Sequence, residues 1–263
     1  MQIKAKKHFG QNFISDPKLI SKIVDVLGNE FDQLVIEIGP GTGALTTELV
    51  KRFKKVVAIE IDPDLEMVLK NKINSANFEI VLADVLTIDF KTIIEKYHFK
   101  NVSVISNIPY YITGEILFKT FNVSHLLTKA VFMMQKEVAL RICATQGQKN
   151  YNNLSVVSQF FADRKYQFTV VKGMFRPIPK VDSAIVSLTF NNQHKTKVKD
   201  QKEFIEFVRK LFNNKRKTIL NNLTNLTNDK NKALAYLNKV AIDYKKRPEQ
   251  LSLDEFISLF NII

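Results

Sequence analysis

The sequence is poor in the residues that build disulfides and metal sites. Its 263 residues include one cysteine, Cys143, and four histidines. A disulfide framework needs paired cysteines, and a zinc site needs clustered Cys or His ligands at short spacings. We therefore expect neither a disulfide nor a metal site in this protein.

Long apolar runs are also missing. The longest, such as residues 130–134, fall far short of the roughly 20 residues that a membrane-spanning helix needs. Residues 1–7 carry charge but are not followed by the apolar core of a signal peptide. These absences predict a soluble protein of the reducing cytoplasm with no membrane partner, and we expect it to be a monomer.

Acidic residues are outnumbered by basic ones. Lys and Arg total 39 against 26 for Asp and Glu, which gives a net charge of +13. The hydrophobic fraction of 45% and the charged fraction of 25% are close to the globular average, so a disordered chain and a fibrous repeat are excluded. A positive surplus of this size favours polyanionic partners, such as nucleic acid or an anionic membrane surface.

Short apolar runs alternate with amphipathic helical segments over most of the chain. The runs predicted as buried strands are residues 34–38, 56–61, 78–82, 102–106 and 130–134. Continuous apolar strands between helices predict a parallel sheet covered on both faces, that is, a Rossmann-like α/β fold. Residues 166–171 and 184–190 are two further β-rich runs with only a proline-containing loop between them, which predicts a terminal antiparallel hairpin.

The composition turns polar at residues 191–196, and every later segment has helical spacing. Residues 252–255, Ser-Leu-Asp-Glu, form a capping box that opens the last helix. We therefore predict two domains, a Rossmann-like domain at residues 1–190 and a small all-α domain at residues 191–263.

A glycine cluster, EIGPGTG at residues 37–43, lies where the first predicted strand turns into a helix. Glycines there let a ligand approach the backbone, and a helix N-terminus offers free N–H groups. Gly39, Gly41 and Ala44 also satisfy the dinucleotide pattern, and Glu60 follows Gly39 by 21 residues. On these residues alone, a nicotinamide dinucleotide remains one of the possible ligands.

Two further residues favour S-adenosylmethionine over a dinucleotide. Asp84 ends the third predicted strand, where its carboxylate can accept from an adenine amino group while Glu60 accepts from the ribose hydroxyls. Pro40 removes an N–H that a pyrophosphate would use. The alternative is that Glu60, Asp62 and Asp84 only cap the helices that follow them.

The fourth predicted strand ends in NIPY, residues 107–110, at the same sheet edge. An adenine amine is a weak nucleophile because its lone pair is delocalised into the ring. The side-chain carbonyl of Asn107 and the backbone carbonyl of Pro109 can each accept one of its N–H groups, and Tyr110 offers an aromatic face for the base. The segment therefore predicts methyl transfer to an adenine amine, achieved mainly by positioning. The alternative is a simple strand-to-turn segment with a packed tyrosine.

A second aromatic candidate lies in the loop of the predicted hairpin. Phe175 begins the segment FRPIPK, residues 175–180, in which two prolines stiffen the backbone. Its ring is suited to stack on the other face of an extruded base. The alternative is a phenylalanine packed beneath the loop.

Taken together, these segments resemble the rRNA adenine N6-dimethyltransferases, and within them the type that acts on the small subunit. The resemblance runs nearly end to end and is carried by KHFGQNFI at 7–14, EIGPGTG at 37–43, NIPY at 107–110 and FRPIPKVDS at 175–183. It implies the fold of class I S-adenosylmethionine-dependent methyltransferases, with S-adenosylmethionine as the cofactor.

The resemblance also implies roles for individual residues. Those that would contact S-adenosylmethionine are Asn12, Ile14, Gly39, Gly41, Glu60, Asp84 and Asn107. Asn107, Pro109 and Tyr110 would hold the target adenine, with Phe175 as the second stacking partner. The implied reaction adds two methyl groups to each of two adjacent adenosines near the 3′ end of 16S rRNA, late in assembly of the 30S subunit. A large-subunit methyltransferase that confers macrolide resistance and a non-catalytic assembly factor remain as alternatives.

Basic residues gather in the C-terminal part of the chain. Residues 195–218 hold nine Lys or Arg residues against three acids. Within this stretch, Lys215, Arg216 and Lys217 are predicted to contact RNA phosphates, together with Lys6 and Lys7 near the N-terminus. The alternative is that these charges are simply solvated.

Overall fold

The computed structural model describes residues 5, 6 and 9–263. The chain forms two compact units. The first consists of the described residues up to Ala139 together with Lys165–Phe190, and the second of Leu140–Arg164 together with Asn191–Ile263.

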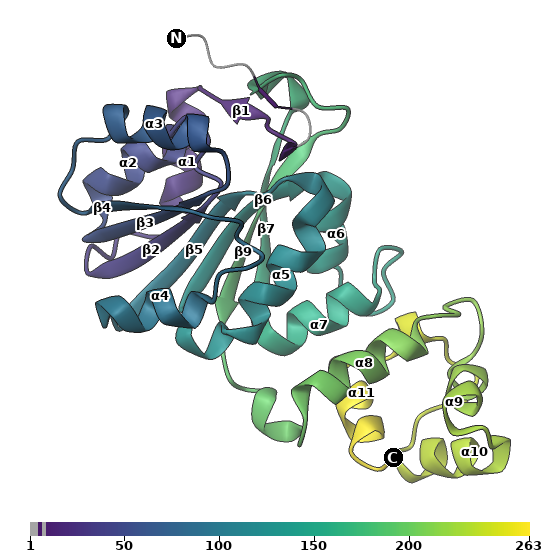
Figure 1. Ribbon diagram of the computed structural model, residues 1–263. Coiled ribbons are helices and arrows are strands. Elements are labelled where there is room, and N and C mark those ends of the chain that lie inside the picture. Colours follow the sequence, from purple (N-terminus) through teal and green to yellow (C-terminus); the bar gives the residue numbers. More distant parts are fainter. Residues whose placement is uncertain (1–4, 7–8) are drawn as a thin grey trace. The chain divides into compact units, whose positions relative to one another are not determined.

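The first unit is built on a seven-stranded sheet with the strand order β4-β3-β2-β5-β6-β9-β7 (Figure 1). Its strands are β2 (Gln33–Ile38), β3 (Lys55–Glu60), β4 (Phe78–Leu82), β5 (Asn101–Asn107), β6 (Lys129–Gln135), β7 (Ala162–Val170) and β9 (Ser183–Phe190). Strands β2 to β6 pair in parallel, and β9 pairs antiparallel with β6. The predicted Rossmann-like sheet, mostly parallel and closed by an antiparallel strand, is confirmed.

The parallel register brings the carboxyl ends of the central strands to one edge. Ile38 of β2 pairs with Ile59 of β3 and with Ser106 of β5. Glu60, at the end of β3, pairs with Leu82 of β4. The segments that follow β2, β3, β4 and β5 therefore begin side by side, which is where a Rossmann-like sheet binds its ligands.

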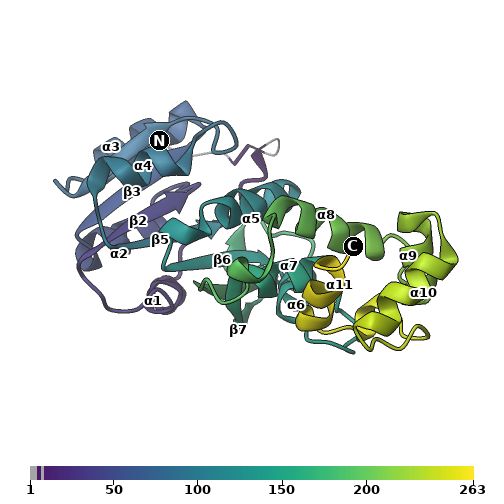
Figure 2. The ribbon, with the colours of Figure 1, turned by 90° about the horizontal axis from the view of Figure 1, so that it is seen from below.

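Helices cover both faces of this sheet. They are α1 (Pro17–Asp25), α2 (Ala44–Arg52), α3 (Pro63–Lys72), α4 (Phe90–Tyr97), α5 (Thr113–Asn122) and the start of α6 (Lys136–Cys143). Figures 1 and 2 show α1 and α2 on one face and α4 and α5 on the other. Val24 of α1 and Leu49 of α2 pack against Val35 and Ile105 of the strands in one buried cluster. Burial on both faces explains why the strands β2, β3 and β6 are largely apolar.

A second, two-stranded sheet joins the N-terminal segment to the loop before β9. Strand β1 (Phe13–Ile14) pairs antiparallel with β8 (Phe175–Arg176), and Ile14 lies opposite Phe175. The sequence analysis did not predict this pairing. It fixes the start of the chain to the far end of the first unit's sequence.

The second unit is helical. It contains the end of α6 together with α7 (Asn153–Phe161), α8 (Gln201–Leu211), α9 (Ile219–Thr227), α10 (Lys230–Lys239) and α11 (Leu253–Phe260). The predicted capping box of the last helix is present, because Ser252 and Glu255 bond to each other's backbone N–H. No helix in the described part of the chain has the length and apolar character of a membrane span.

The helical unit includes residues that the predicted division at 190/191 assigned to the first domain. The ring of Phe160 in α7 lies 4.8 Å from that of Phe204 in α8, centroid to centroid. The hydroxyl of Tyr151 donates to the carbonyl of Leu251 at 3.1 Å. These aromatic contacts place Leu140–Arg164 in the helical unit, although Asn191 remains a point where the chain crosses between units.

Candidate active site

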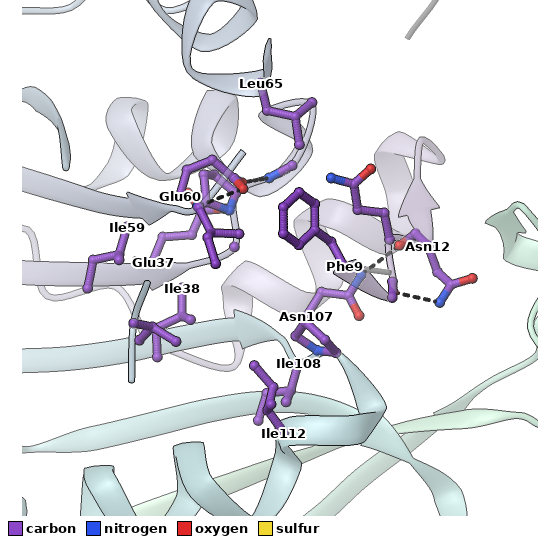
Figure 3. Close-up of a pocket in the computed structure, with 18 of the residues that line it drawn as sticks. Phe9, Asn12, Glu37, Ile38, Ile59, Glu60, Leu65, Asn107, Ile108 and Ile112 are labelled. Carbon is purple, nitrogen blue, oxygen red and sulfur yellow. Dashed lines mark hydrogen bonds between the residues drawn. The ribbon is translucent and has the colours of Figure 1, made fainter. Parts of the chain in front are cut away.

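A pocket lies at the carboxyl ends of β2, β3 and β5 (Figure 3). Its walls come from the N-terminal segment, the glycine turn after β2 and the segments after β3, β4 and β5. The predicted site residues that line it are Asn12, Ile14, Gly39, Gly41, Glu60, Asp84, Asn107, Pro109 and Tyr110. Residues from five separate segments thus meet around one cavity.

The glycine turn leaves space for a ligand at the floor of the pocket. Gly39 has a φ of +65°, and a Cβ atom placed there would meet nothing within 4 Å. Gly41 has a φ of +58°, and a Cβ placed there would lie 3.1 Å from the ring of Phe13. Both positions therefore favour glycine, the first with open room beside it and the second because the N-terminal segment packs closely.

Glu60 organises the backbone around the pocket. It is only 4% exposed. Its Oε1 accepts the N–H groups of Ile61 and Asp62 at 2.9 Å each, and its Oε2 accepts the N–H of Gly41 at 3.3 Å. Burial raises the pKa of the Glu60 carboxyl, while these backbone N–H groups act in the opposite direction. Three of the roughly four acceptor positions of a carboxylate are used, so Glu60 can still accept a hydroxyl.

The capping alternative holds for Asp62 but not for Asp84, since the N-cap of the next helix, α4, is Asp89. Asp62 is the N-cap of α3 and accepts the N–H of Asp64 at 3.1 Å. Oδ1 of Asp84 accepts the N–H of Leu86 at 2.8 Å, and its Oδ2 has no hydrogen bond from any residue that the structure describes. Asp84 therefore shapes its turn and keeps one oxygen for a ligand.

Apolar side chains line the same pocket as Asp84. Ile61 and Leu86 both line the pocket, yet Ile61 is 42% and Leu86 37% exposed. Exposed aliphatic surface inside a concave site is suited to the faces of a flat ring. The combination of Asp84, Ile61 and Leu86 matches the needs of a nucleobase with an amino group.

Asn107 connects the end of β5 to the N-terminal segment. Its Nδ2 donates to the backbone carbonyl of Asn12 at 2.8 Å (Figure 3). The side chain of Asn12 donates in turn to the carbonyl of Gly10 at 3.0 Å. Because the NH₂ group of Asn107 is directed at Asn12, its Oδ1 is left to accept a hydrogen bond.

Pro109 and Tyr110 continue from Asn107 around the pocket. The carbonyl oxygen of Pro109 accepts the N–H of Ile112 at 3.1 Å. This uses one of its two lone pairs and leaves the other to accept a second hydrogen bond. The hydroxyl of Tyr110 lies 2.7 Å from Oγ of Ser183. Burial is the main cause of a raised pKa for the Tyr110 phenol, so this side chain is neutral at physiological pH.

The comparisons with known proteins agree with this site. Residues 2–263 match the family model described as "Ribosomal RNA adenine dimethylase". The chain belongs to that family. It is 65% identical over 261 residues to "Ribosomal RNA small subunit methyltransferase A" of Mycoplasma capricolum, covering 99% of this chain and 98% of the relative.

Solved structures of the family have the same fold. A dimethyladenosine transferase from Plasmodium falciparum superposes with a TM-score of 0.78 at 28% identity, covering 94% of this chain and 95% of that one. The 23S rRNA methyltransferase ErmE superposes with a TM-score of 0.72 at 24% identity, covering 95% and 98%. The second likeness concerns the fold alone.

In this ribosomal RNA adenine dimethylase, the N-terminal segment closes one side of the pocket. We call residues 9–14 the N-terminal strap. Phe9 points into the pocket (Figure 3). Nζ of Lys6 lies 2.7 Å from a carboxylate oxygen of Asp62 and 2.7 Å from one of Asp64, and Nε2 of Gln11 donates to Asp62 at 3.0 Å. Lys6 precedes the strap and donates its backbone N–H to Oε1 of Gln11 at 2.8 Å. Lys6 and Gln11 thus tie the strap to the start of α3, and β1 ties it to β8.

Lys6, which was predicted to contact RNA, pairs with Asp62 and Asp64 in the structure. Both carboxylates beside its ammonium raise the pKa of Lys6, so the charge is kept and is directed at the protein. The sequence analysis missed Phe9 and Gln11 as site residues. Gln11 gave no local signal, because its partner Asp62 is 51 positions away.

Glu37 is a further site residue that the sequence analysis did not single out. It lines the pocket and is 1% exposed. The hydroxyl of Thr46 donates to its Oε2 at 2.7 Å. Burial raises the pKa of Glu37 to about 8. The available signal was an acid inside an otherwise apolar strand, since buried acids often mark functional sites.

The predicted stacking role of Phe175 is not supported. Its ring is fully buried, packs in the core cluster with Ile14, Met133 and Ile185, and does not line the pocket. Pairing of β8 with β1 is the reason, because it turns Phe175 inward and Arg176 outward. The alternative of a phenylalanine packed beneath the loop is the one found.

The predicted RNA-binding residues of the C-terminal region lie in the helical unit. Lys215, Arg216 and Lys217 are exposed in the loop between α8 and α9. None of the three forms an ion pair with a carboxylate in the described part of the chain. Lys7 falls outside the described residues.

Proposed function

We propose that this chain is an S-adenosylmethionine-dependent methyltransferase that dimethylates N6 of two adjacent adenosines near the 3′ end of 16S rRNA. Its substrate would be the assembling 30S subunit in the cytoplasm, and the protein would act as a monomer. The observation that carries the proposal is the hydrogen bond from Asn107 to the carbonyl of Asn12, because it sets which atom of Asn107 faces the substrate.

The pocket fits S-adenosylmethionine. Gly39 offers open space beside the backbone, Glu60 keeps acceptor capacity for a ribose hydroxyl, and Asp84 keeps one oxygen for an adenine amino group. Ile61 and Leu86 supply apolar surface for the adenine ring. Pro40 lacks the N–H that a pyrophosphate would use, which disfavours a dinucleotide.

The residues after β5 would hold the target adenine. Oδ1 of Asn107 and the remaining lone pair of Pro109 O would each accept one N–H of the amine. This localises the nitrogen lone pair and directs it away from the ring. Tyr110 would stack on the base. S-adenosylmethionine, when bound, supplies a methyl group on a positively charged sulfur.

No general base is required in this arrangement. Among the pocket-lining residues around the NIPY segment, the acceptors are an amide and backbone carbonyls, and Tyr110 is neutral. A methylated adenine amine loses its extra proton readily to water. Positioning of the amine is therefore the main contribution of these residues to the rate.

The choice of the small subunit as the substrate rests on sequence rather than on fold. The relative that is 65% identical over nearly the whole chain is named for the small subunit. The likeness to a 23S rRNA methyltransferase is limited to 24% identity. The exposed cations at Lys215, Arg216 and Lys217 would contact phosphates and place the RNA without reading its sequence.

The test uses purified protein and radiolabelled S-adenosylmethionine. Undermethylated small subunits and, separately, naked large-subunit rRNA are offered as substrates, and the RNA is digested to nucleosides. Dimethyladenosine from the small subunit alone is the expected result. Label in large-subunit rRNA would mean that the substrate is the large-subunit rRNA and not the small subunit. Tight binding to small subunits with no label would point to a non-catalytic assembly factor.

A further inference from the structure

Tyr110 is held at its hydroxyl end by a buried serine. The hydroxyl lies 2.7 Å from Oγ of Ser183, which is fully buried. Tyr110 lines the pocket, whereas Ser183 is not among the lining residues. Ser183 can therefore influence a substrate only through Tyr110.

Ser183 sits on a firmly held backbone. It is the first residue of β9 and pairs with Gln135 of β6. Asp182, the residue before it, makes two further contacts. Its carbonyl accepts the N–H of Lys136 at 3.0 Å, and its carboxylate accepts the N–H of Lys172 at 2.9 Å. Three connections thus fix the backbone that carries the serine hydroxyl.

The opposite end of Tyr110 is also fixed. Its backbone starts a short 3₁₀ turn (Tyr110–Ile112), and its carbonyl accepts the hydroxyl of Thr113 at 3.2 Å. The hydroxyl oxygen of a tyrosine lies on the axis of χ2, so its hydrogen bond restricts χ1 and with it the direction of the ring axis. With both ends held, the ring axis has one direction in the pocket wall.

We propose that Ser183 is a positioning residue for methyl transfer, because its hydrogen bond to Tyr110 fixes the ring against which the target adenine stacks. This inference rests on the proposed function, since it requires an adenine as the substrate. The position of the ring sets where the amine meets the acceptors of Asn107 and Pro109. A misplacement of about 1 Å in such an arrangement is enough to cost about 100-fold in rate.

A purely structural pair of hydroxyls makes a different prediction. Removing the Tyr110 hydroxyl leaves the fully buried hydroxyl of Ser183 without a hydrogen bond, and removing that of Ser183 costs the half-buried Tyr110 its partner. Removing both leaves no unsatisfied group. The single variants Ser183→Ala and Tyr110→Phe should therefore lower Tm, and the double variant should regain part of the loss. If the pair served only stability, kcat would recover together with Tm.

The experiment compares the two single variants and the double variant with the wild type. It measures Tm, kcat and KM for undermethylated small subunits, and the Kd of S-adenosylmethionine by calorimetry. We expect kcat to fall about 5- to 50-fold in all three variants. In the double variant, kcat should be no lower than in the slower of the two single variants. It should also stay low although Tm recovers in part. KM and Kd should stay within about twofold, because neither hydroxyl is placed to contact RNA phosphate or cofactor.

Ser103→Ala is the matched control. Ser103 is a buried serine in β5 whose hydroxyl donates to Gln33 at 3.0 Å, and it does not line the pocket. This variant should lower Tm while kcat stays within about twofold of the wild type.

The proposal is overturned if the double variant regains the wild-type kcat, or if Ser183→Ala leaves kcat within twofold of the wild type. Should Ser183→Ala fail to fold, Tyr110→Phe alone decides, since it keeps the ring and removes only the hydroxyl. The rate of methyl transfer by the wild type tests the proposed function. The differences in kcat among the variants test the positioning role of Ser183, so each proposal can fail without the other.

Discussion

The side-chain amide of Asn107 donates to the backbone carbonyl of Asn12 at 2.8 Å. This single contact links the end of the fourth parallel strand to a segment 95 positions earlier in the chain. It orients the amide of Asn107, and it fixes the N-terminal strap across the pocket. Closure of the pocket and orientation of the amine acceptor are therefore coupled.

Replacing Asn107 tests this coupling. Asn107→Ala removes the acceptor for the adenine amine, and we expect transfer to fall by at least about 100-fold, the usual size for loss of a positioned polar group. Binding to undermethylated small subunits, measured by co-sedimentation, should stay within about twofold, since the proposed phosphate contacts are those of Lys215, Arg216 and Lys217. An equal loss of binding and transfer would contradict the role assigned to Asn107.

A second prediction concerns the ion pair that holds the strap. Lys6→Met removes the contacts with Asp62 and Asp64. The affinity for S-adenosylmethionine, measured by calorimetry, should fall about two- to fivefold, as expected for a partly exposed ion pair. Lys51→Met is the matched control, because Lys51 pairs with Glu48 on the exposed side of α2. If Lys6 instead contacts RNA, its replacement will weaken subunit binding and leave cofactor affinity unchanged.

The parts of the fold that could be predicted are those with a local signal. Apolar runs and helical spacing predicted the order of strands and helices. The Ser-Leu-Asp-Glu pattern at residues 252–255 predicted the start of α11, where Ser252 and Glu255 accept each other's backbone N–H. The site residues after β3 and β5 followed from one topological rule, that ligands bind at the carboxyl ends of parallel strands.

The parts that could not be predicted depend on contacts between distant segments. Strands β1 and β8 have two residues each, too few for any periodicity, and they pair across about 160 positions. That pairing buried Phe175, whose proline-rich surroundings had indicated an exposed loop. Lys6 likewise looked like a free cation until the fold brought Asp62 beside it.

The exposed cations between α8 and α9 give a third prediction. Replacing Lys215, Arg216 and Lys217 together with alanine should weaken subunit binding and make it less dependent on salt. Each lost phosphate contact lowers the slope of log K against log salt by about 0.7 to 1. A variant with Lys230, Lys232 and Lys239 of α10 replaced carries the same change in charge and serves as the control. If log K falls with log salt at the same slope in the two variants, the loop acts only through the net charge of the protein and not through phosphate contacts of its own.

The buried carboxyl of Glu37 gives a prediction about pH. Its pKa is raised from 4.5 to about 8 by burial, so between these values the folded protein binds more protons than the unfolded chain does. Stability must then fall as pH rises from about 5 to 8 and level off above that range. The slope from one such group is at most about 1.4 kcal/mol per pH unit.

Glu37→Gln isolates this contribution. Glutamine resembles the protonated carboxyl and can still accept the hydroxyl of Thr46. The free energy of unfolding from urea titrations should therefore decline less steeply between pH 5 and 8 in the variant than in the wild type. Glu60, whose pKa is also raised by burial, is present in both proteins, and its charge adds to the raised pKa of Glu37. Parallel curves for the two proteins would show that Glu37 is ionised throughout this range, and the neutral carboxyl inferred for the pocket wall would be wrong.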